Sequence, residues 1–145
     1  MKAPQFLIRV VLVVGGGVLV LLVVGATLLW FFGPDPCGNE IISESPSPDG
    51  SKRLVIFQRD CGATTGFSTQ ASMLPAGNEL PSKKGNVFIS DTNHGAAPSG
   101  PGSGPAVKVT WQSPTSVVLS YNPKVRVFLS ESEVSGVYFQ YVTEP

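Results

Sequence analysis

Two cysteines are the residues of this sequence with the most distinctive chemistry. Cys37 and Cys61 are the only ones in the chain. In an oxidising compartment two cysteines allow a single intramolecular disulfide, which would stabilise a fold by roughly 3.5 kcal/mol according to the chain-entropy model. One histidine with two cysteines provides too few ligands for structural zinc. We therefore expect a Cys37–Cys61 disulfide with no metal and no cofactor, and two free thiols are the alternative.

Polar side chains are concentrated on both sides of the second cysteine. Arg59, Asp60, Thr64 and Thr65 lie within four residues of Cys61. One interpretation is a recognition surface on which a charged pair and hydroxyls converge on a ligand. The other is a structural connection, in which the hydroxyls satisfy backbone groups and Asp60 pairs with Arg59 or caps the turn. The second interpretation is favoured.

Acid–base and nucleophilic catalysis have few candidates. A small hydrolase would need Asp60, His94 and Ser68 to meet in one cleft, and His94 is the only histidine. The sequence has no G-x-S-x-G motif, phosphate loop or dinucleotide fingerprint. We expect His94 to be a solvent-exposed loop residue without a catalytic role.

One long apolar segment decides in which compartment these side chains lie. Residues 10–32 form 23 consecutive positions without a charge. As a helix they would be about 34 Å long, enough to cross a bilayer core of ~30 Å. A cleaved signal peptide is the alternative, but its apolar region should be only about 7–15 residues long and should precede a small-residue cleavage site. We expect an uncleaved signal-anchor helix that contacts membrane lipid.

The charges that flank this segment predict its orientation. Lys2 and Arg9 precede it, and the next basic residue is Lys52. The positive-inside rule then places residues 1–9 in the cytoplasm and residues 33–145 outside. We expect a bacterial inner-membrane protein with its C-terminal domain in the periplasm.

The segment after the anchor has the size and charge of one small domain. Residues 33–145 contain eight Lys and Arg against ten Asp and Glu, a net charge of −2. Such a domain lacks the basic surface that nucleic acids and anionic head groups require, so we expect neither as a partner. Its length suffices for one hydrophobic core.

Short apolar runs, and no sustained helical period, predict that this domain consists of strands. Candidate strands lie at residues 41–42, 53–60, 67–74, 86–91, 107–111, 117–121, 124–130 and 136–142. The run at 53–60 has apolar residues on both faces, which is typical of a central strand. The spacing predicts an all-β fold, an antiparallel meander forming a small sandwich or open barrel, preceded by one N-terminal transmembrane helix.

Two connections have a distinctive composition. Ser47-Pro48-Asp49-Gly50 predicts a tight turn, because Pro presets φ, Asp bonds nearby backbone and Gly tolerates positive φ. Residues 93–105 contain four Gly and three Pro. We expect this second connection to be a flexible excursion that contributes nothing to the core.

Several short motifs occur between residues 37 and 141. They are C-G-N at 37–39, S-P-D-G at 47–50, R-D-C-G-A-T-T at 59–65, G-N-V-F-I at 85–89 and V-x-W at 109–111. Together they resemble a family of small bacterial envelope proteins that contain a domain of unknown function. The resemblance implies a bacterial envelope location and no particular activity.

These observations favour a non-enzymatic function. We expect a membrane-anchored periplasmic binding or interaction module whose partner is another envelope protein. A structural subunit of an inner-membrane complex is the first alternative, and the small hydrolase is the second.

The predicted orientation can be tested with protease. Protease added after the outer membrane is opened should degrade residues 33–145, because the positive-inside rule places them in the periplasm. Protease that reaches only the cytoplasmic face should leave this domain intact, as detected by an antibody against the C-terminus. Digestion from the cytoplasmic face would reverse the orientation and remove the case for an oxidised cysteine pair.

Overall fold

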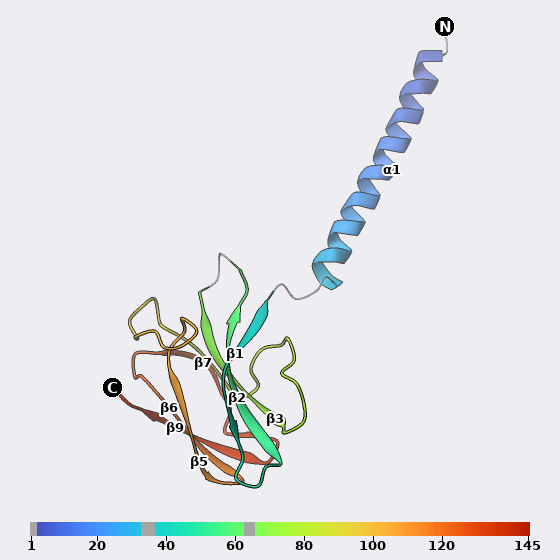
Figure 1. The fold of residues 1–145 in the computed structure, drawn as a ribbon. Coiled ribbons are helices and arrows are strands. Elements are labelled where there is room, and N and C mark those ends of the chain that lie inside the picture. Colours follow the sequence, from blue (N-terminus) through green and yellow to red (C-terminus); the bar gives the residue numbers. More distant parts are fainter. Residues whose placement is uncertain (1–2, 33–36, 63–65) are drawn as a thin grey trace. The chain divides into compact units, whose positions relative to one another are not determined.

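The computed structural model describes residues 3–32, 37–62 and 66–145 of the chain (Figure 1). The chain divides into two compact units, Met1–Asp35 and Pro36–Pro145. The first contains a helix and the second contains strands.

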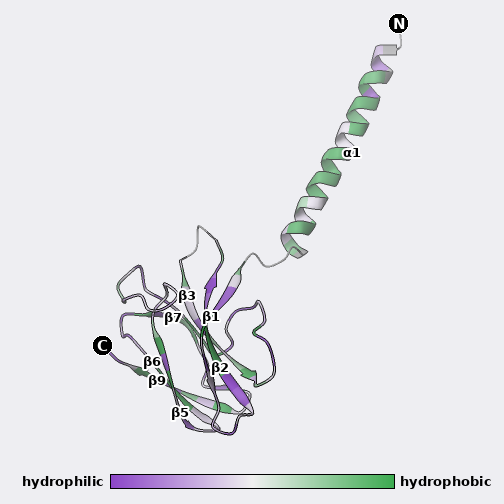
Figure 2. Cartoon of the chain, viewed as in Figure 1, coloured by the Kyte–Doolittle hydropathy of each residue, from purple (hydrophilic) through white to green (hydrophobic). Residues whose placement is uncertain are grey.

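Helix α1 runs over Ala3–Phe32 and begins seven residues before the charge-free segment. Its stretch Leu7–Phe31 is long and apolar enough to cross a membrane, and none of it is buried in the protein. Figure 2 shows the apolar colouring along this helix. The added N-terminal turns include Arg9, whose long side chain can reach a polar interface. The predicted apolar N-terminal helix is confirmed.

The strands form two sheets. The first sheet, in spatial order, contains β1 (Gly38–Pro46), β2 (Lys52–Asp60), β3 (Ser68–Pro75), β4 (Phe88–Asp91) and β7 (Arg126–Ser130), all antiparallel. The second contains β5 (Val107–Ser113), β6 (Ser116–Tyr121), β9 (Val137–Thr143) and β8 (Glu133–Val134). The predicted all-β fold after a single N-terminal helix is confirmed.

The strand order departs from a simple meander at its end. After β6 the chain crosses to the first sheet as β7 and returns as β8 and β9, so β9 pairs with β6 in parallel. A parallel pair requires such a crossover. Strand β8 was not predicted, because it is only two residues long. It forms a hairpin with β9 through Ser135 and Gly136, which both adopt the positive φ that is typical of a two-residue hairpin turn.

Strand β1 is nine residues long where only residues 41–42 were expected. A bulge between Ile41 and Ser43 interrupts the alternation of side chains, and most of the strand is exposed and polar. Edge strands with these features lack a strong periodic signal.

The hydrophobic core lies between the two sheets. It is formed by Leu54, Ile56, Ala71, Met73, Val87, Phe88, Val117, Leu119, Val137 and Phe139. The ring of Phe88 packs 5.0 Å from that of Tyr121 and 5.7 Å from that of Tyr141, measured between centroids. Burial, followed by the charge of Glu131, raises the pKa of Tyr141, so its hydroxyl stays protonated and donates to the Glu131 carbonyl at 2.7 Å.

Strand β2 is buried on both faces, as its sequence predicted. Leu54 and Ile56 face the second sheet, whereas Val55 and Phe57 point the other way and are 0 % exposed. Residues 76–87 lie against this second face (Figure 1), where the Gly85 N–H donates to Gln70 Oε1 at 2.7 Å. A Cβ on Gly85 would meet the Ala71 carbonyl oxygen at 2.7 Å, so the loop approaches β3 too closely for any other residue.

The turn between β1 and β2 has the predicted geometry. The Gly50 N–H donates to the Ser47 carbonyl at 2.9 Å, and Gly50 has φ of 69°. Hydrogen bonds from the Ser47 hydroxyl and then from Ser51 lower the pKa of Asp49 to about 2. The carboxylate thus holds the turn in its ionised form.

The prediction that residues 93–105 contribute nothing to the core was wrong. Ala97 is 2 % exposed, and the Pro105 carbonyl accepts a hydrogen bond from the Thr69 hydroxyl at 2.7 Å. The Gly100 N–H bonds the Gly104 carbonyl at 2.7 Å, which closes a tight loop. The composition misled because the glycines permit close packing instead of free motion.

Gly104→Ala tests this packing. A Cβ at Gly104 would stand 2.4 Å from Thr69 Oγ1 and 2.9 Å from the Thr69 backbone nitrogen. We expect the substitution to lower the free energy of unfolding by roughly 1–3 kcal/mol, as overpacking does. The matched control is Gly77→Ala, because a Cβ there meets nothing within 4 Å. Equal denaturation midpoints for the two variants would show that the loop does not press on β3.

Candidate functional site

A row of polar residues crosses all five strands of the first sheet. Each member lies directly opposite the next in the strand register, and the row consists of Asn39, Arg59, Ser68, Asp91 and Arg126. Directly paired residues point to the same face of a sheet. We call these five residues the polar row. Its two ends have different surroundings.

The β1–β2 end of the polar row is interior structure. Arg59 is 4 % exposed, and its Nη1 donates to Asn39 Oδ1 at 2.6 Å. Asn39 Nδ2 in turn donates to the carbonyls of Pro81 at 2.9 Å and Lys83 at 2.8 Å. Arg59 therefore helps to hold the loop of residues 76–87 in place and presents little surface to a ligand.

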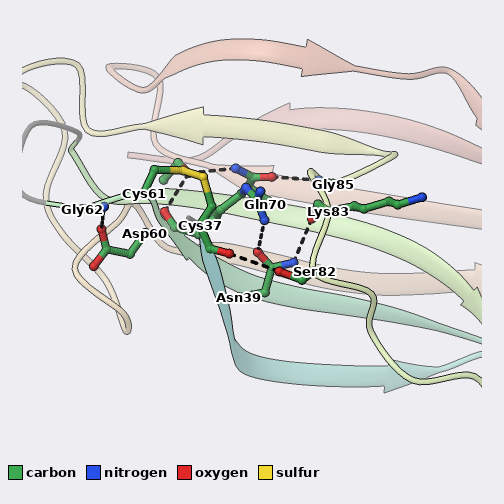
Figure 3. The surroundings of a disulfide bond; sticks show 11 residues. Cys37, Asn39, Asp60, Cys61, Gly62, Gln70, Ser82, Lys83 and Gly85 are labelled. Atoms are coloured by element: carbon green, nitrogen blue, oxygen red, sulfur yellow. Dashed lines mark hydrogen bonds between the residues drawn. A yellow bond between two sulfur atoms is a disulfide. The ribbon is translucent and has the colours of Figure 1, made fainter. Parts of the chain in front are cut away.

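The predicted Cys37–Cys61 disulfide is confirmed and lies next to this end (Figure 3). It follows immediately after the Gly38–Asp60 pair, so it extends the β1–β2 ladder by one position. The Ser82 hydroxyl donates to the Cys37 carbonyl at 3.1 Å. The disulfide thus fixes the start of the domain, immediately after the segment that leads from α1.

The remaining members of the predicted recognition surface are placed as follows. Asp60 is exposed, and its Oδ1 accepts a hydrogen bond from the Gly62 N–H at 2.9 Å, so the carboxylate caps a local turn. Thr64 and Thr65 lie outside the described residues. Within the described part of this segment, the contacts of Arg59 and Asp60 are those of the structural interpretation.

The β4–β7 end of the polar row is open to solvent. Arg126 forms an ion pair with Asp91 through Nε and Nη2, and its guanidinium lies 4.9 Å from the centre of the Phe128 ring. Partial burial acts to raise the pKa of Asp91, but hydrogen bonds from Arg126 and the Asn93 N–H outweigh it and lower this pKa. The hydrogen bond with Asp91 raises the pKa of Arg126.

A cleft of ≈ 330 Å³ opens beside this ion pair. Its lining consists of Gly66, Phe67, Asp91, Thr92, His94, Ser103 and Arg126. We call it the Arg126 cleft. Phe67 is 43 % exposed and supplies an apolar wall, whereas the other side chains are polar.

The rim of the Arg126 cleft contains residues in an uncommon backbone conformation. Asn93, His94 and Ser103 have φ of 51°, 56° and 63°. Such left-handed conformations at non-glycine residues cost on the order of 1 kcal/mol each and are concentrated at ligand sites. His94 is exposed, as predicted, and its Nε2 lies 3.3 Å from Arg126 Nη1.

Arg126 retains hydrogen-bonding capacity. A guanidinium has five N–H donors. Three have partners among the described residues, on Asp91 and His94, and the side chain is 42 % exposed. Two donors therefore remain for an acceptor that enters the cleft, on an arginine whose position is already held by an ion pair and an aromatic ring.

The three residues of the hydrolase hypothesis make separate contacts. The Ser68 hydroxyl bonds the Arg59 carbonyl at 3.3 Å and accepts from Gln70 Nε2 at 2.9 Å. His94 contacts Arg126, and Asp60 contacts the Gly62 backbone. No described hydrogen bond joins any two of Asp60, His94 and Ser68, so the geometry gives no support to a triad. Within the described ranges no three His, Cys, Asp or Glu side chains are grouped to hold a metal ion.

Sequence reasoning missed most of the Arg126 cleft. Asp91 was recognised as the end of a strand and as a neighbour of His94 in D-T-N-H-G, and Arg126 only as the polar side of another strand. The one local signal was D-T-N at 91–93, an Asx turn in which Asp91 Oδ1 accepts from the Asn93 N–H at 2.8 Å. The pairing with Arg126 spans 35 positions and has no local signature.

Comparison with protein-family models, curated proteins and solved structures finds no match to this chain. The resemblance to a bacterial envelope family stays a prediction. The functional argument therefore depends on the geometry of the site itself.

The Asp91–Arg126 pair predicts a specific response to acid. Because the pKa of Asp91 is lowered on folding, its contribution to stability is present above about pH 3.8 and is lost as the pH falls further. Asp91→Asn should thus be less stable than the wild type at pH 6, and the difference should shrink between pH 4 and pH 2 in urea unfolding. In an Arg126→Ala background the same substitution should show a smaller dependence on pH. A difference in stability between Asp91→Asn and the wild type that does not change with pH would contradict the lowered pKa of Asp91.

Proposed function

We propose that this protein is a membrane-anchored binding module of the bacterial envelope, without catalytic activity. In this proposal residues 1–9 are cytoplasmic, residues 10–32 cross the inner membrane and residues 33–145 are in the periplasm. The Arg126 cleft binds an acceptor-bearing segment of another envelope protein.

The location is supported by two independent features. Lys2 and Arg9 precede the apolar helix, and this asymmetry favours a cytoplasmic N-terminus. The Cys37–Cys61 disulfide is typical of a domain that folds in an oxidising compartment. Both features favour the periplasm for the strand domain.

The observation that carries the binding function is the state of Arg126. Asp91 and the Phe128 ring hold its guanidinium in place, and two of its five N–H donors have no partner among the described residues. Pre-positioning lowers the entropy lost on binding. A carboxylate is the acceptor that best matches a guanidinium, and the exposed Phe67 ring can cover an adjacent apolar side chain. The ligand chemistry we propose is an acidic segment with an apolar neighbour.

The test is photo-crosslinking in intact cells from a photoreactive residue at position 67. We expect a cross-linked adduct that a second substitution, Arg126→Ala, abolishes or strongly reduces. The matched probe site is Tyr138, which is 58 % exposed and belongs to β9, outside the cleft lining. The matched charge control is Lys108→Ala, since Lys108 is exposed on β5.

The outcomes separate the hypotheses. An equal yield of the cross-linked adduct with and without the Arg126→Ala substitution would contradict binding through this cleft. Co-purification of the same partner with residues 1–32 alone would instead favour a structural subunit held by its anchor. Loss of a measured hydrolytic activity on His94→Ala, with the fold unchanged, would favour the enzyme.

A further inference from the structure

His94 makes a contact with Arg126 that depends on the protonation state of the imidazole. Its Nε2 lies 3.3 Å from Arg126 Nη1. Because a guanidinium can only donate hydrogen bonds, Nε2 must accept, and the imidazole in this contact is neutral with its proton on Nδ1. A protonated imidazole has an N–H on both nitrogens and accepts no hydrogen bond. The contact therefore exists in only one charge state of His94.

Two hydrogen bonds of the neighbouring Asn93 hold the His94 loop beside the ion pair. The Asn93 N–H donates to Asp91 Oδ1 at 2.8 Å, and Asn93 Nδ2 donates to the Lys124 carbonyl at 3.3 Å. They join the loop to β4 on one side and to the segment before β7 on the other. Asn93 and His94 both have left-handed backbone conformations, which persist only where the surrounding structure holds them. The imidazole is thus kept next to the guanidinium.

The charged side chains that act on His94 have opposite signs. Among the described residues they are Arg126 on β7, which it contacts, and Asp91 on β4, which its charge also reaches. While the imidazole is neutral, the charges of Asp91 and Arg126 cancel. The pKa of Asp91 is lowered, so its carboxylate remains ionised in the range between about pH 5 and 8 in which an imidazole changes charge. Protonation of His94 therefore gives this group of three side chains a net charge of about +1.

Protonation also changes which donors face the cleft. The Arg126 Nη1 hydrogen that His94 accepted loses its partner, so a third guanidinium donor becomes available to a ligand. The imidazole itself gains an N–H donor at Nε2. An acceptor with a negative charge, such as a carboxylate, gains from the added charge and from both added donors.

We propose, on the basis of the binding function proposed above, that His94 is a specificity residue that makes the Arg126 cleft bind carboxylates more tightly in acid. Histidine is the side-chain type that ordinarily changes charge between about pH 5 and 8, and this chain has one. Its two cysteines form a disulfide and contribute no thiol that could titrate. A change of affinity over this range is therefore expected to arise at the cleft itself.

The test measures how tightly the full-length chain in dodecylmaltoside micelles binds the peptide acetyl-Leu-Asp-Leu-amide, near pH 5.5 and near pH 8. The only ionisable group of this peptide is one carboxylate, which is ionised at both pH values. One added charge at an exposed site changes binding severalfold, so we expect a Kd about threefold to tenfold lower at the acidic pH. Nuclear magnetic resonance of histidine-labelled protein follows the protonation of His94 directly, because there is no second histidine.

Two substitutions separate the charge of His94 from its place in the structure. His94→Gln retains an acceptor but never carries a charge, so the ratio of its Kd values at the two pH values should fall to about one. His94→Lys is charged at both pH values, so it should also give a ratio of about one and should bind more tightly than His94→Gln near pH 8. Equal melting temperatures of the two variants and an intact disulfide are the check of folding.

The matched probe is acetyl-Leu-Asn-Leu-amide, which has an amide in place of the carboxylate. Its binding should not depend on pH, because it has no charge for a protonated imidazole to attract. An increase in acid that equals that of the aspartate peptide would contradict recognition of a carboxylate.

The remaining outcomes distinguish the pH dependence from the binding function. Binding of the aspartate peptide that is equal at both pH values, but is lost in Arg126→Ala, would overturn the role of His94 and support the cleft as a binding site. A pH dependence that persists in His94→Gln would also overturn this role, as would equal affinities of the Gln and Lys variants near pH 8. Absence of binding by the wild type at both pH values would overturn the proposed ligand chemistry, and the role of His94 with it.

Discussion

Strand β2 is buried on both of its faces, and a different part of the domain packs against each face. Four consecutive residues, Leu54 to Phe57, are at most 1 % exposed. An apolar strand of this kind needs a second layer on each side, because a half-covered strand would leave two large side chains in water. The second sheet covers one face, and residues 76–87 cover the other. This loop is not a regular element, so its backbone needs polar partners within the fold.

The polar side chains of the first sheet supply those partners. Asn39 donates to two loop carbonyls, Gln70 accepts from Gly85, and Arg53 Nη2 donates to the Asn78 carbonyl at 2.6 Å. Arg59 holds Asn39 in turn. Buried donors and acceptors must be satisfied, and these side chains help to meet that requirement for the backbone of the loop. The polar row continues onto β4 and β7, where Asp91 and Arg126 line the Arg126 cleft together with loop residues such as His94.

Arginine thus has two different environments along the polar row. Arg59 and Arg126 occupy equivalent register positions on the same face, yet one is interior and the other is half exposed. The side chains of this face that hydrogen-bond with residues 76–87 lie on β1, β2 and β3, and they include Asn39, Arg53 and Gln70. Of these two arginines, Arg126 is the one that is both accessible and held in place by an ion pair. The packing around each arginine, and not the residue type, decides which of the two remains accessible.

The sequence by itself determined the features that depend on local pattern or on composition. The apolar helix follows from 23 charge-free residues, the two-sided burial of β2 from its continuous apolar run, the turn at Asp49 from its residue types, and the disulfide from the presence of only two cysteines. The tertiary structure alone decided the crossover that makes β6 and β9 parallel, the packing of Gly104 on Thr69, and the meeting of Asp91 with Arg126. These are contacts between segments that are distant in the sequence. They depend on which elements pack against the same apolar surface. Contacts of this kind leave no periodic pattern and no local motif in the sequence, so only the packing of the whole chain determines them.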